Sequence, residues 1–108
     1  MKKLTVILAA VVLTGCFTAK KIAPSQTDVD RMAAKFPGYT LAELNEGKGL
    51  YEANCGACHG LKKPTSEPES EWRRIVPDMV RKVNKNGMVL DNAKEERILK
   101  YLITMSGR

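Results

Sequence analysis

Cys55-Gly56-Ala57-Cys58-His59 is the stretch that decides how this chain folds. The spacing C-x-x-C-H is the signature for covalent attachment of a c-type haem. Two thiols about one helical turn apart can add across the two vinyl groups of a haem, and the imidazole that follows lies under the iron as its proximal ligand. We therefore predict one haem c, with Cys55 and Cys58 as thioether donors and His59 as an iron ligand.

Residues 1–15 have the composition of an export signal. Two lysines precede an apolar run at positions 4–13, which is too short to span a bilayer as a structural helix. The run ends in Leu13-Thr14-Gly15-Cys16, which resembles the lipobox of bacterial lipoproteins. This resemblance implies cleavage before Cys16 and lipidation of its thiol and amine, which anchors a protein stably because more than one acyl chain inserts. The alternative is an ordinary signal peptide cleaved near Ala19.

The cysteine and charge counts agree with this division. The chain has 3 cysteines, so a lipid on Cys16 leaves both others in the haem motif and none for a disulfide. Removing residues 1–15 leaves 93 of the 108 residues. A domain of this size without disulfides has a marginal hydrophobic core, and a covalently held haem would add to its apolar contacts. The net charge falls from +6 to +4, which gives no reason to expect nucleic acid. This basic excess suits an acidic redox partner or anionic lipid headgroups, and a plain solvated surface is the alternative.

The segment before the haem motif predicts a tether followed by helices. Residues 16–27 lack periodicity, which is typical of a flexible tether, and the haem domain is expected to span residues 28–108. A short helix over 28–36, capped by Thr27 or Asp28, is expected to end at Pro37-Gly38.

A longer helix is expected from Thr40 to Cys55. It opens with Thr40-Leu41-Ala42-Glu43, which matches the capping-box pattern. Its apolar residues and the first cysteine recur at helical spacing on one face. Gly47 and Gly49 weaken a helix, so we expect another helix to cross closely there.

Two further helices are expected after the motif, and no strand pattern is present. The loop from residue 61 to 70 contains Pro64 and Pro68, and a helix follows from about residue 69 to 84. Its apolar stripe is predicted to be Trp72, Val76, Met79 and Val83. Pro77 should kink this helix or lie in its first turn. The last helix should begin after Asp91 and run to about residue 105, with Ile98, Leu102 and Met105 facing inward and Gly107 at its C-terminal cap.

His59 is the single histidine, so two histidines cannot ligate the iron. Haem c iron with one histidine usually takes a methionine sulfur on its other side, which raises the reduction potential. The candidates are Met32, Met79, Met88 and Met105.

The span from about Thr40 to Leu102 resembles the small exported monohaem c-type cytochromes. The residues that carry the resemblance are Gly47 with Tyr51, the haem motif, Pro64, Trp72 with Ile75, Val76 and Met79, and Tyr101-Leu102. The resemblance implies an all-α, cytochrome c-like domain around one covalent haem, with Met79 as the sixth iron ligand. It also implies that a proline carbonyl, from Pro64 or Pro68, accepts the second N–H of His59. The chain departs from the pattern at Pro77, and Met88 follows a glycine turn as in larger class I cytochromes, so Met88 stays a candidate ligand.

The leading functional prediction is an exported, lipid-anchored electron carrier and not an enzyme. It would lie on the periplasmic side of a bacterial membrane, or at the cell surface, and exchange electrons with exported or membrane-bound redox proteins. One alternative is a haem module whose sixth position opens to a gas or small oxidant. Another is a dithiol or zinc site at Cys55 and Cys58, which lacks the further ligands that zinc needs.

Overall fold

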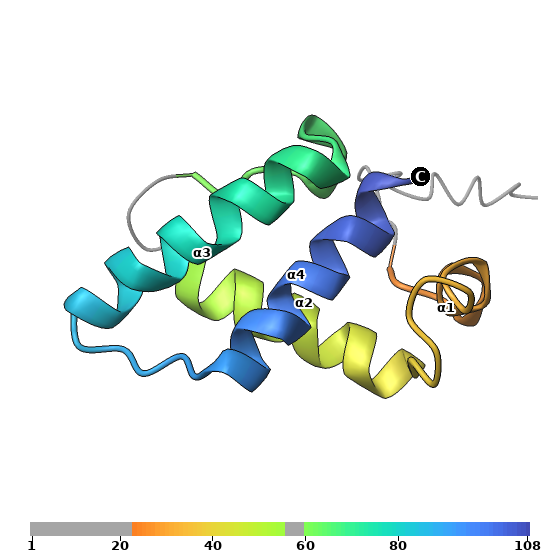
Figure 1. Ribbon diagram of the computed structural model, residues 1–108, viewed down its shortest axis with the longest axis horizontal. Coiled ribbons are helices and arrows are strands. Elements are labelled where there is room, and N and C mark those ends of the chain that lie inside the picture. Colours follow the sequence, from red (N-terminus) through yellow and green to blue (C-terminus); the bar gives the residue numbers. More distant parts are fainter. Residues whose placement is uncertain (1–22, 56–59) are drawn as a thin grey trace, which may run out of the picture.

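The computed structural model describes residues 23–55 and 60–108, which fold into helices joined by short loops. The elements are α1 (Gln26–Arg31), α2 (Leu41–Cys55), the short 3₁₀ helix η1 (Pro64–Ser66), α3 (Glu69–Lys85) and α4 (Asn92–Ser106). Figure 1 shows α4 crossing α2, with α3 beside α4 and α1 at the end of the molecule where the C-terminus lies. The described residues contain no strand, and the all-α prediction is confirmed.

The predicted signal segment 1–15 and the predicted lipidation site Cys16 lie outside the described residues. Within the ranges that are described, no helix combines the length and apolar character needed to cross a bilayer.

Helix α1 begins earlier and ends earlier than the predicted helix over 28–36. It starts at Gln26, inside the predicted tether, because Ser25 and Asp28 form a capping box in which the Ser25 N–H donates to the Asp28 carboxylate at 2.9 Å. It ends at Arg31, and turns carry the chain to Gly38, whose positive φ of 76° suits glycine. The N-cap residue is therefore Ser25 and not Thr27 or Asp28 as predicted, and Asp28 completes the capping box from the first turn of the helix.

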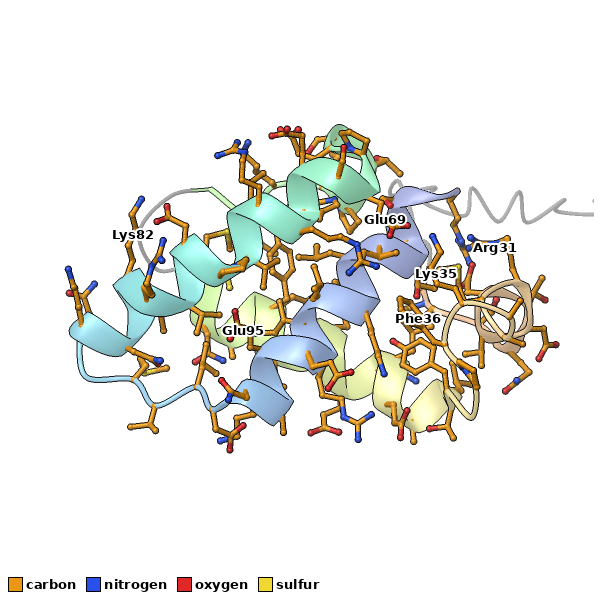
Figure 2. All side chains as sticks on the ribbon, viewed as in Figure 1. Arg31, Lys35, Phe36, Glu69, Lys82 and Glu95 are labelled. Carbon is orange, nitrogen blue, oxygen red and sulfur yellow. The ribbon has the colours of Figure 1, made fainter. Side chains whose placement is uncertain are left out.

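Asp28 ties α1 to the end of the chain. Its carboxylate is buried and accepts hydrogen bonds from Arg108 at 2.8 and 2.6 Å and from Arg31 at 3.0 Å. Arg31 also donates to the Thr104 carbonyl of α4 at 3.1 Å. We call Asp28, Arg31 and Arg108 the terminal clamp. A second ion pair, between Lys35 and Glu69, joins the turn after α1 to the start of α3 (Figure 2).

Helix α2 has the predicted bounds and makes half of the predicted capping box. The Thr40 hydroxyl accepts from the Glu43 N–H at 3.2 Å, but the Glu43 carboxylate pairs with Arg97 of α4 at 2.8 Å. The predicted close crossing is confirmed at Gly47, where an added Cβ would lie 2.2 Å from the Arg97 carbonyl oxygen. It is wrong at Gly49, because a Cβ there would meet no atom within 4 Å.

Helix α3 is continuous through Pro77, so the prediction that this proline confines the first turn is wrong. Its fully buried stripe is Trp72, Val76, Val80 and Val83. Val80 thus takes the core position that we expected for Met79, which is only half-buried. The spacing of four, four and three residues keeps the stripe on one face, and Met79 lies next to it.

Helix α4 begins as predicted and lies at the centre of the fold. Asp91 caps it by accepting from the Lys94 N–H at 2.8 Å, and its inward residues Ile98, Leu102 and Met105 are buried. Gly107 follows the helix with an ordinary φ of −81°, so it does not form the left-handed cap typical of glycine. An added Cβ there would lie 2.9 Å from Nη1 of Arg31, which is the end of a flexible side chain and can move aside.

Three aromatic rings meet where α2, α3 and α4 pack together. The Tyr51 ring lies edge-on to Trp72 at 6.2 Å between centroids, and 5.9 Å from Tyr101. Such pairs add to the stabilisation that burial already provides. They fix the end of α2 that leads into the C-x-x-C-H motif.

Candidate functional site

Cys55 is the last residue of α2 and is half-buried. The preceding turn is held by Asn54, whose side chain donates to the Leu50 carbonyl at 2.8 Å. Burial raises the pKa of the Cys55 thiol to about 11. Reactive redox cysteines usually have lowered pKa values, so the raised pKa does not add support to the dithiol alternative.

The other residues of the motif, Gly56 to His59, lie outside the described residues. The roles of Cys58 and His59 therefore stay predictions. Among residues 23–55 and 60–108, no group of three or more His, Cys, Asp or Glu side chains could hold a metal ion.

Cys55 and Met79 line the same cleft, which has a volume of about 300 Å³. It lies between the C-terminal end of α2, the segment that follows the motif, and one face of α3. The lining residues are Asn54, Cys55, Gly60, Lys62, Arg74, Ile75, Asp78, Met79, Lys82 and Val83. The first predicted haem attachment residue and the first predicted sixth ligand thus face one space.

Helix α3 presents two parallel rows of side chains to this cleft. The apolar row is Ile75, Met79 and Val83, and the charged row is Arg74, Asp78 and Lys82. Both rows follow an i, i+4, i+8 spacing, which places each on one line along a helix and makes each about 12 Å long. Met79 is at the middle of the apolar row.

The other candidate methionines are placed differently. Met88 is 45% exposed in the turn between α3 and α4, and Met32 and Met105 are buried in the core. The turn is held by Asn84, whose side chain accepts from the Leu90 N–H at 2.7 Å and donates to the Leu90 carbonyl at 3.0 Å. Of the methionines in the described residues, Met79 alone lines the cleft.

The segment after the motif is held against α2 and α3 by two aromatic side chains. The Tyr51 hydroxyl donates to the Lys62 carbonyl at 2.6 Å, and the Trp72 indole N–H donates to the Pro64 carbonyl at 2.9 Å. The sequence predicted the helices on which Tyr51 and Trp72 lie but not these hydrogen bonds. A backbone carbonyl is present in every residue, so no sequence pattern indicates which one will accept a bond.

The carbonyls of the two prolines predicted to bind His59 accept hydrogen bonds from other residues. The Pro64 carbonyl accepts from Trp72, although a carbonyl oxygen has a second lone pair for another donor. The Pro68 carbonyl accepts the first backbone bonds of α3, from Glu71 and Trp72, at 3.1 Å each. Pro68 therefore serves mainly to begin α3.

Replacing Tyr51 by phenylalanine should remove one of these two bonds without disturbing the aromatic packing. We expect a loss of about 1 kcal/mol of unfolding free energy, the usual net contribution of a hydrogen bond. Tyr101→Phe is a matched control, because the Tyr101 hydroxyl makes no hydrogen bond among the described residues. Urea unfolding followed by circular dichroism measures the difference, and equal losses in the two variants would contradict the assignment.

The residues of this cleft fit a covalently bound haem. Cys55 supplies a thiol for a thioether bond, Met79 supplies a neutral sulfur for the iron, and the apolar row supplies a surface for the face of the porphyrin. Lys62 and Arg74 supply positive charge for the carboxylates of a haem, whereas Lys82 is paired with Asp78 in the same cleft.

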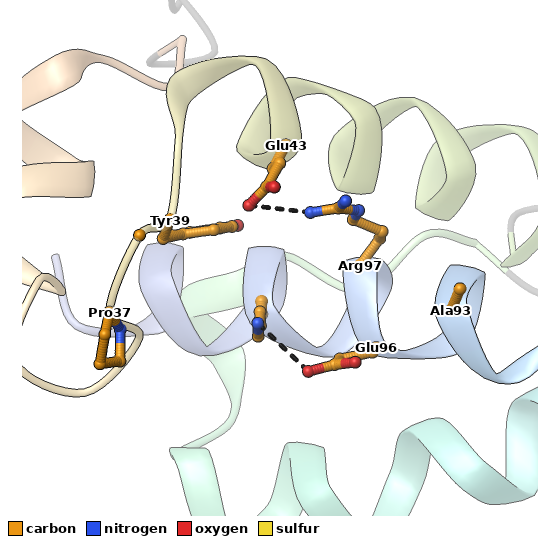
Figure 3. Close-up of a pocket in the computed structure, with 8 residues that line it drawn as sticks. Pro37, Tyr39, Glu43, Ala93, Glu96 and Arg97 are labelled. Atoms are coloured by element: carbon orange, nitrogen blue, oxygen red, sulfur yellow. Dashed lines mark ion pairs between the residues drawn. The ribbon is translucent and has the colours of Figure 1, made fainter.

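A second cleft, of about 240 Å³, does not have a lining suited to a covalently bound haem. It lies between the turn at Pro37-Gly38, α2 and α4, and its charged residues pair with one another (Figure 3). Glu43 pairs with Arg97 at 2.8 Å, and Glu96 pairs with Lys100 at 3.1 Å. No cysteine, methionine or histidine is among the described residues that line it.

Comparison with known proteins identifies the family. Residues 51–108, more than half of the chain, match the family model described as dihaem cytochrome c. No curated protein and no solved structure matches the chain. The matched span contains the C-x-x-C-H motif, Met79, α3 and α4, and the prediction of a c-type cytochrome is confirmed. The family description names two haems, whereas the sequence has one C-x-x-C-H motif and one histidine. The chain belongs to the dihaem cytochrome c family.

Proposed function

We propose that this protein is a lipid-anchored electron carrier that binds one haem c, with His59 and Met79 as the axial iron ligands. The observation that carries the proposal is that Cys55 and Met79 line one cleft. A bound haem supplies one-electron chemistry, because its iron cycles between Fe(III) and Fe(II). Family membership supports haem-based electron transfer, and the ligand pair and the haem count are our inference.

The residues around the cleft support the two roles of this proposal, covalent attachment of the haem and ligation of its iron. Cys55 forms one thioether by adding its sulfur to a vinyl carbon, while the thiol proton goes to the neighbouring vinyl carbon. Cys58 does the same with the second vinyl group, and His59 binds the iron on the proximal side. Met79 binds it from α3, where it is half-buried and outside the fully buried stripe. A methionine that only filled the core would occupy the stripe itself.

A single haem is supported by the residue counts. The chain has 3 cysteines and 1 histidine, so a second C-x-x-C-H motif cannot be formed. We infer that this chain keeps one of the two attachment sites that its family is named for.

Anchorage is supported by the sequence alone. The lipobox-like Leu13-Thr14-Gly15-Cys16 favours lipidation of Cys16, and the C-x-x-C-H motif favours export. The protein would then work on the periplasmic side of a bacterial membrane or at the cell surface. Its partners would be exported or membrane-bound redox proteins, and nucleic acid is not among them.

The visible spectrum of the haem-bearing protein tests the ligand pair. We expect a low-spin spectrum that carbon monoxide leaves unchanged in the reduced wild type. Met79→Ala should open the sixth position, so that the spectrum becomes high-spin and reduced protein binds carbon monoxide rapidly. Met88→Ala is the matched control and should behave as wild type, because Met88 is exposed and does not line the cleft.

Other outcomes would replace this assignment with a defined alternative. If Met88→Ala opened the iron and Met79→Ala did not, Met88 would be the ligand. If wild type already bound carbon monoxide rapidly, the gas- or oxidant-binding alternative would be favoured. The mass of the intact protein gives the haem count in the same preparation, and two haems per chain would contradict the proposal.

A further inference from the structure

Two cations lie at one end of the haem cleft and come from different elements. Lys62 belongs to the segment that follows the motif, and Arg74 belongs to α3. Lys62 pairs with Glu67 at 3.0 Å, and the pKa of Arg74 is raised chiefly by its hydrogen bond to Glu71 and to a smaller extent by the charge of Glu67. We call Lys62 and Arg74 the cation pair of the cleft.

The rest of the fold holds the cation pair in place. The Lys62 carbonyl is bound by the Tyr51 hydroxyl at 2.6 Å, and the Pro64 carbonyl is bound by the Trp72 indole at 2.9 Å. Trp72 is fully buried and lies two residues before Arg74 on α3. The backbone positions of both cations are therefore fixed relative to each other, and only their long side chains are free to adjust.

The acidic partners of the cation pair, Glu67 and Glu71, do not line the cleft. Arg74 pairs with Glu71 at 2.8 Å, where the two side chains are 71% and 41% exposed. An ion pair as exposed as that between Arg74 and Glu71 contributes little to the stability of a fold. An anion in the cleft can therefore take over these cations at little cost.

The other end of the charged row is less suited to an anion. Lys82 lines the cleft there, but Asp78 lines it too and pairs with Lys82 at 3.2 Å and with Arg81 at 3.0 Å. A second carboxylate placed beside Asp78 would be repelled. Lys62 and Arg74 thus differ from Lys82, because their ion-pair partners, Glu67 and Glu71, are not among the described residues that line the cleft.

We propose that Lys62 and Arg74 bind the two propionate groups of the haem. This inference rests on the proposed function, because it requires a haem in this cleft. Two cations match two carboxylates in charge, and the planar guanidinium of Arg74 can bind a carboxylate through two hydrogen bonds. The propionate edge then lies against the segment after the motif, away from Asp78 and Lys82.

Resonance Raman spectra of the haem-bearing protein test this assignment through the propionate bending band, whose frequency reports hydrogen bonding to the propionates. We expect Lys62→Gln and Arg74→Gln each to shift this band, and Arg74→Lys to shift it less than Arg74→Gln. Lys82→Gln is the matched control, since it removes the same charge from the other end of the cleft. It should leave the band at its wild-type position.

The reduction potential, measured as a function of pH, distinguishes the loss of a positive charge from the loss of propionate binding. All three glutamine variants should lower the reduction potential slightly, because each removes a positive charge near the iron. We expect only Lys62→Gln and Arg74→Gln to make the potential more dependent on pH, since a propionate without its cation takes up a proton more readily. An unchanged band and pH profile in these two variants, or a larger change in Lys82→Gln, would overturn the proposal.

The two proposals fail in distinguishable ways. If the wild type carries no covalent haem on a denaturing gel, the proposed function fails and the propionate site fails with it. If the wild type and all variants keep covalent haem and a low-spin spectrum while the band does not move, only the propionate site fails. Lys62 and Arg74 are both exposed, so the glutamine variants remove no core contact.

Discussion

Gly47→Ala is expected to destabilise the protein by about 3 kcal/mol, the upper part of the usual range for overpacking. The added methyl group would lie 2.2 Å from the Arg97 carbonyl oxygen and 2.8 Å from the Tyr101 Cβ. Neither atom is the free end of a flexible side chain, so α2 and α4 would have to separate. The Tyr51 and Tyr101 rings, 5.9 Å apart, would separate with them.

Gly49→Ala is the matched control for this prediction. It makes the same chemical change two residues away on α2, where an added Cβ would meet no atom within 4 Å. Alanine is the better helix former, so we expect Gly49→Ala to stabilise the protein by up to about 1 kcal/mol. Urea unfolding followed by far-ultraviolet circular dichroism should thus give changes of opposite sign. A Gly47→Ala variant as stable as wild type would show that the two helices do not touch at this crossing.

Asp28→Asn is the second substitution with a large expected effect. Asp28 is buried, and the change would leave the guanidinium groups of Arg31 and Arg108 without their shared carboxylate. Breaking a fully buried pair costs about 3 to 5 kcal/mol, and since both arginines are partly exposed we expect about 2 kcal/mol here. Asp30→Asn is the control, because Asp30 is exposed on the same helix and only accepts from the Gln26 side chain.

The effect of Asp28→Asn should depend on pH in a defined direction. The Arg108 hydrogen bond, and then those from Ser25 and Arg31, hold the pKa of the Asp28 carboxyl well below its usual value of 3.8, although burial opposes them. A carboxyl with a lowered pKa in the folded state stabilises the fold above its unfolded pKa and loses this contribution as pH falls. Thermal unfolding should show a constant difference between wild type and Asp28→Asn near neutral pH. The difference should shrink below about pH 4, and a difference that grew there would contradict the clamp.

The sequence predicted the helices well where local signals agree with packing. Thr40, Asp91 and the apolar spacing placed α2, α3 and α4 within a residue or two of their observed ends. Helix α1 was misplaced because its capping box depends on Ser25 and Asp28 together, and Asp28 is buried by partners 80 residues away in the sequence. A long-range partner of this kind has no local pattern.

The candidate site likewise contains features that the sequence predicted and features that it did not. The C-x-x-C-H spacing predicted a c-type cytochrome, because the two thiols and the imidazole that attach a haem are contiguous in the sequence, and the family match confirms this class. The resemblance favoured Met79 over Met88 as the sixth ligand, and the structure adds that Met79 lines a cleft with Cys55 whereas Met88 does not. The roles of Tyr51 and Trp72 as donors to backbone carbonyls were missed, because their acceptors lie in the Lys62 and Pro64 backbone.

The terminal clamp also has a mechanical consequence. A pull on the chain ahead of Ala23 would reach Asp28 and its bonds to Arg108 before it reached α2. The tension would then pass into the C-terminal end of α4, through Arg108 and the Arg31 bond to Thr104. Among the described residues, none of α1 lines the haem cleft. Tension applied to the N-terminal segment would therefore be carried by α1 and the end of α4, and the geometry of the cleft lined by Cys55 and Met79 would stay unchanged.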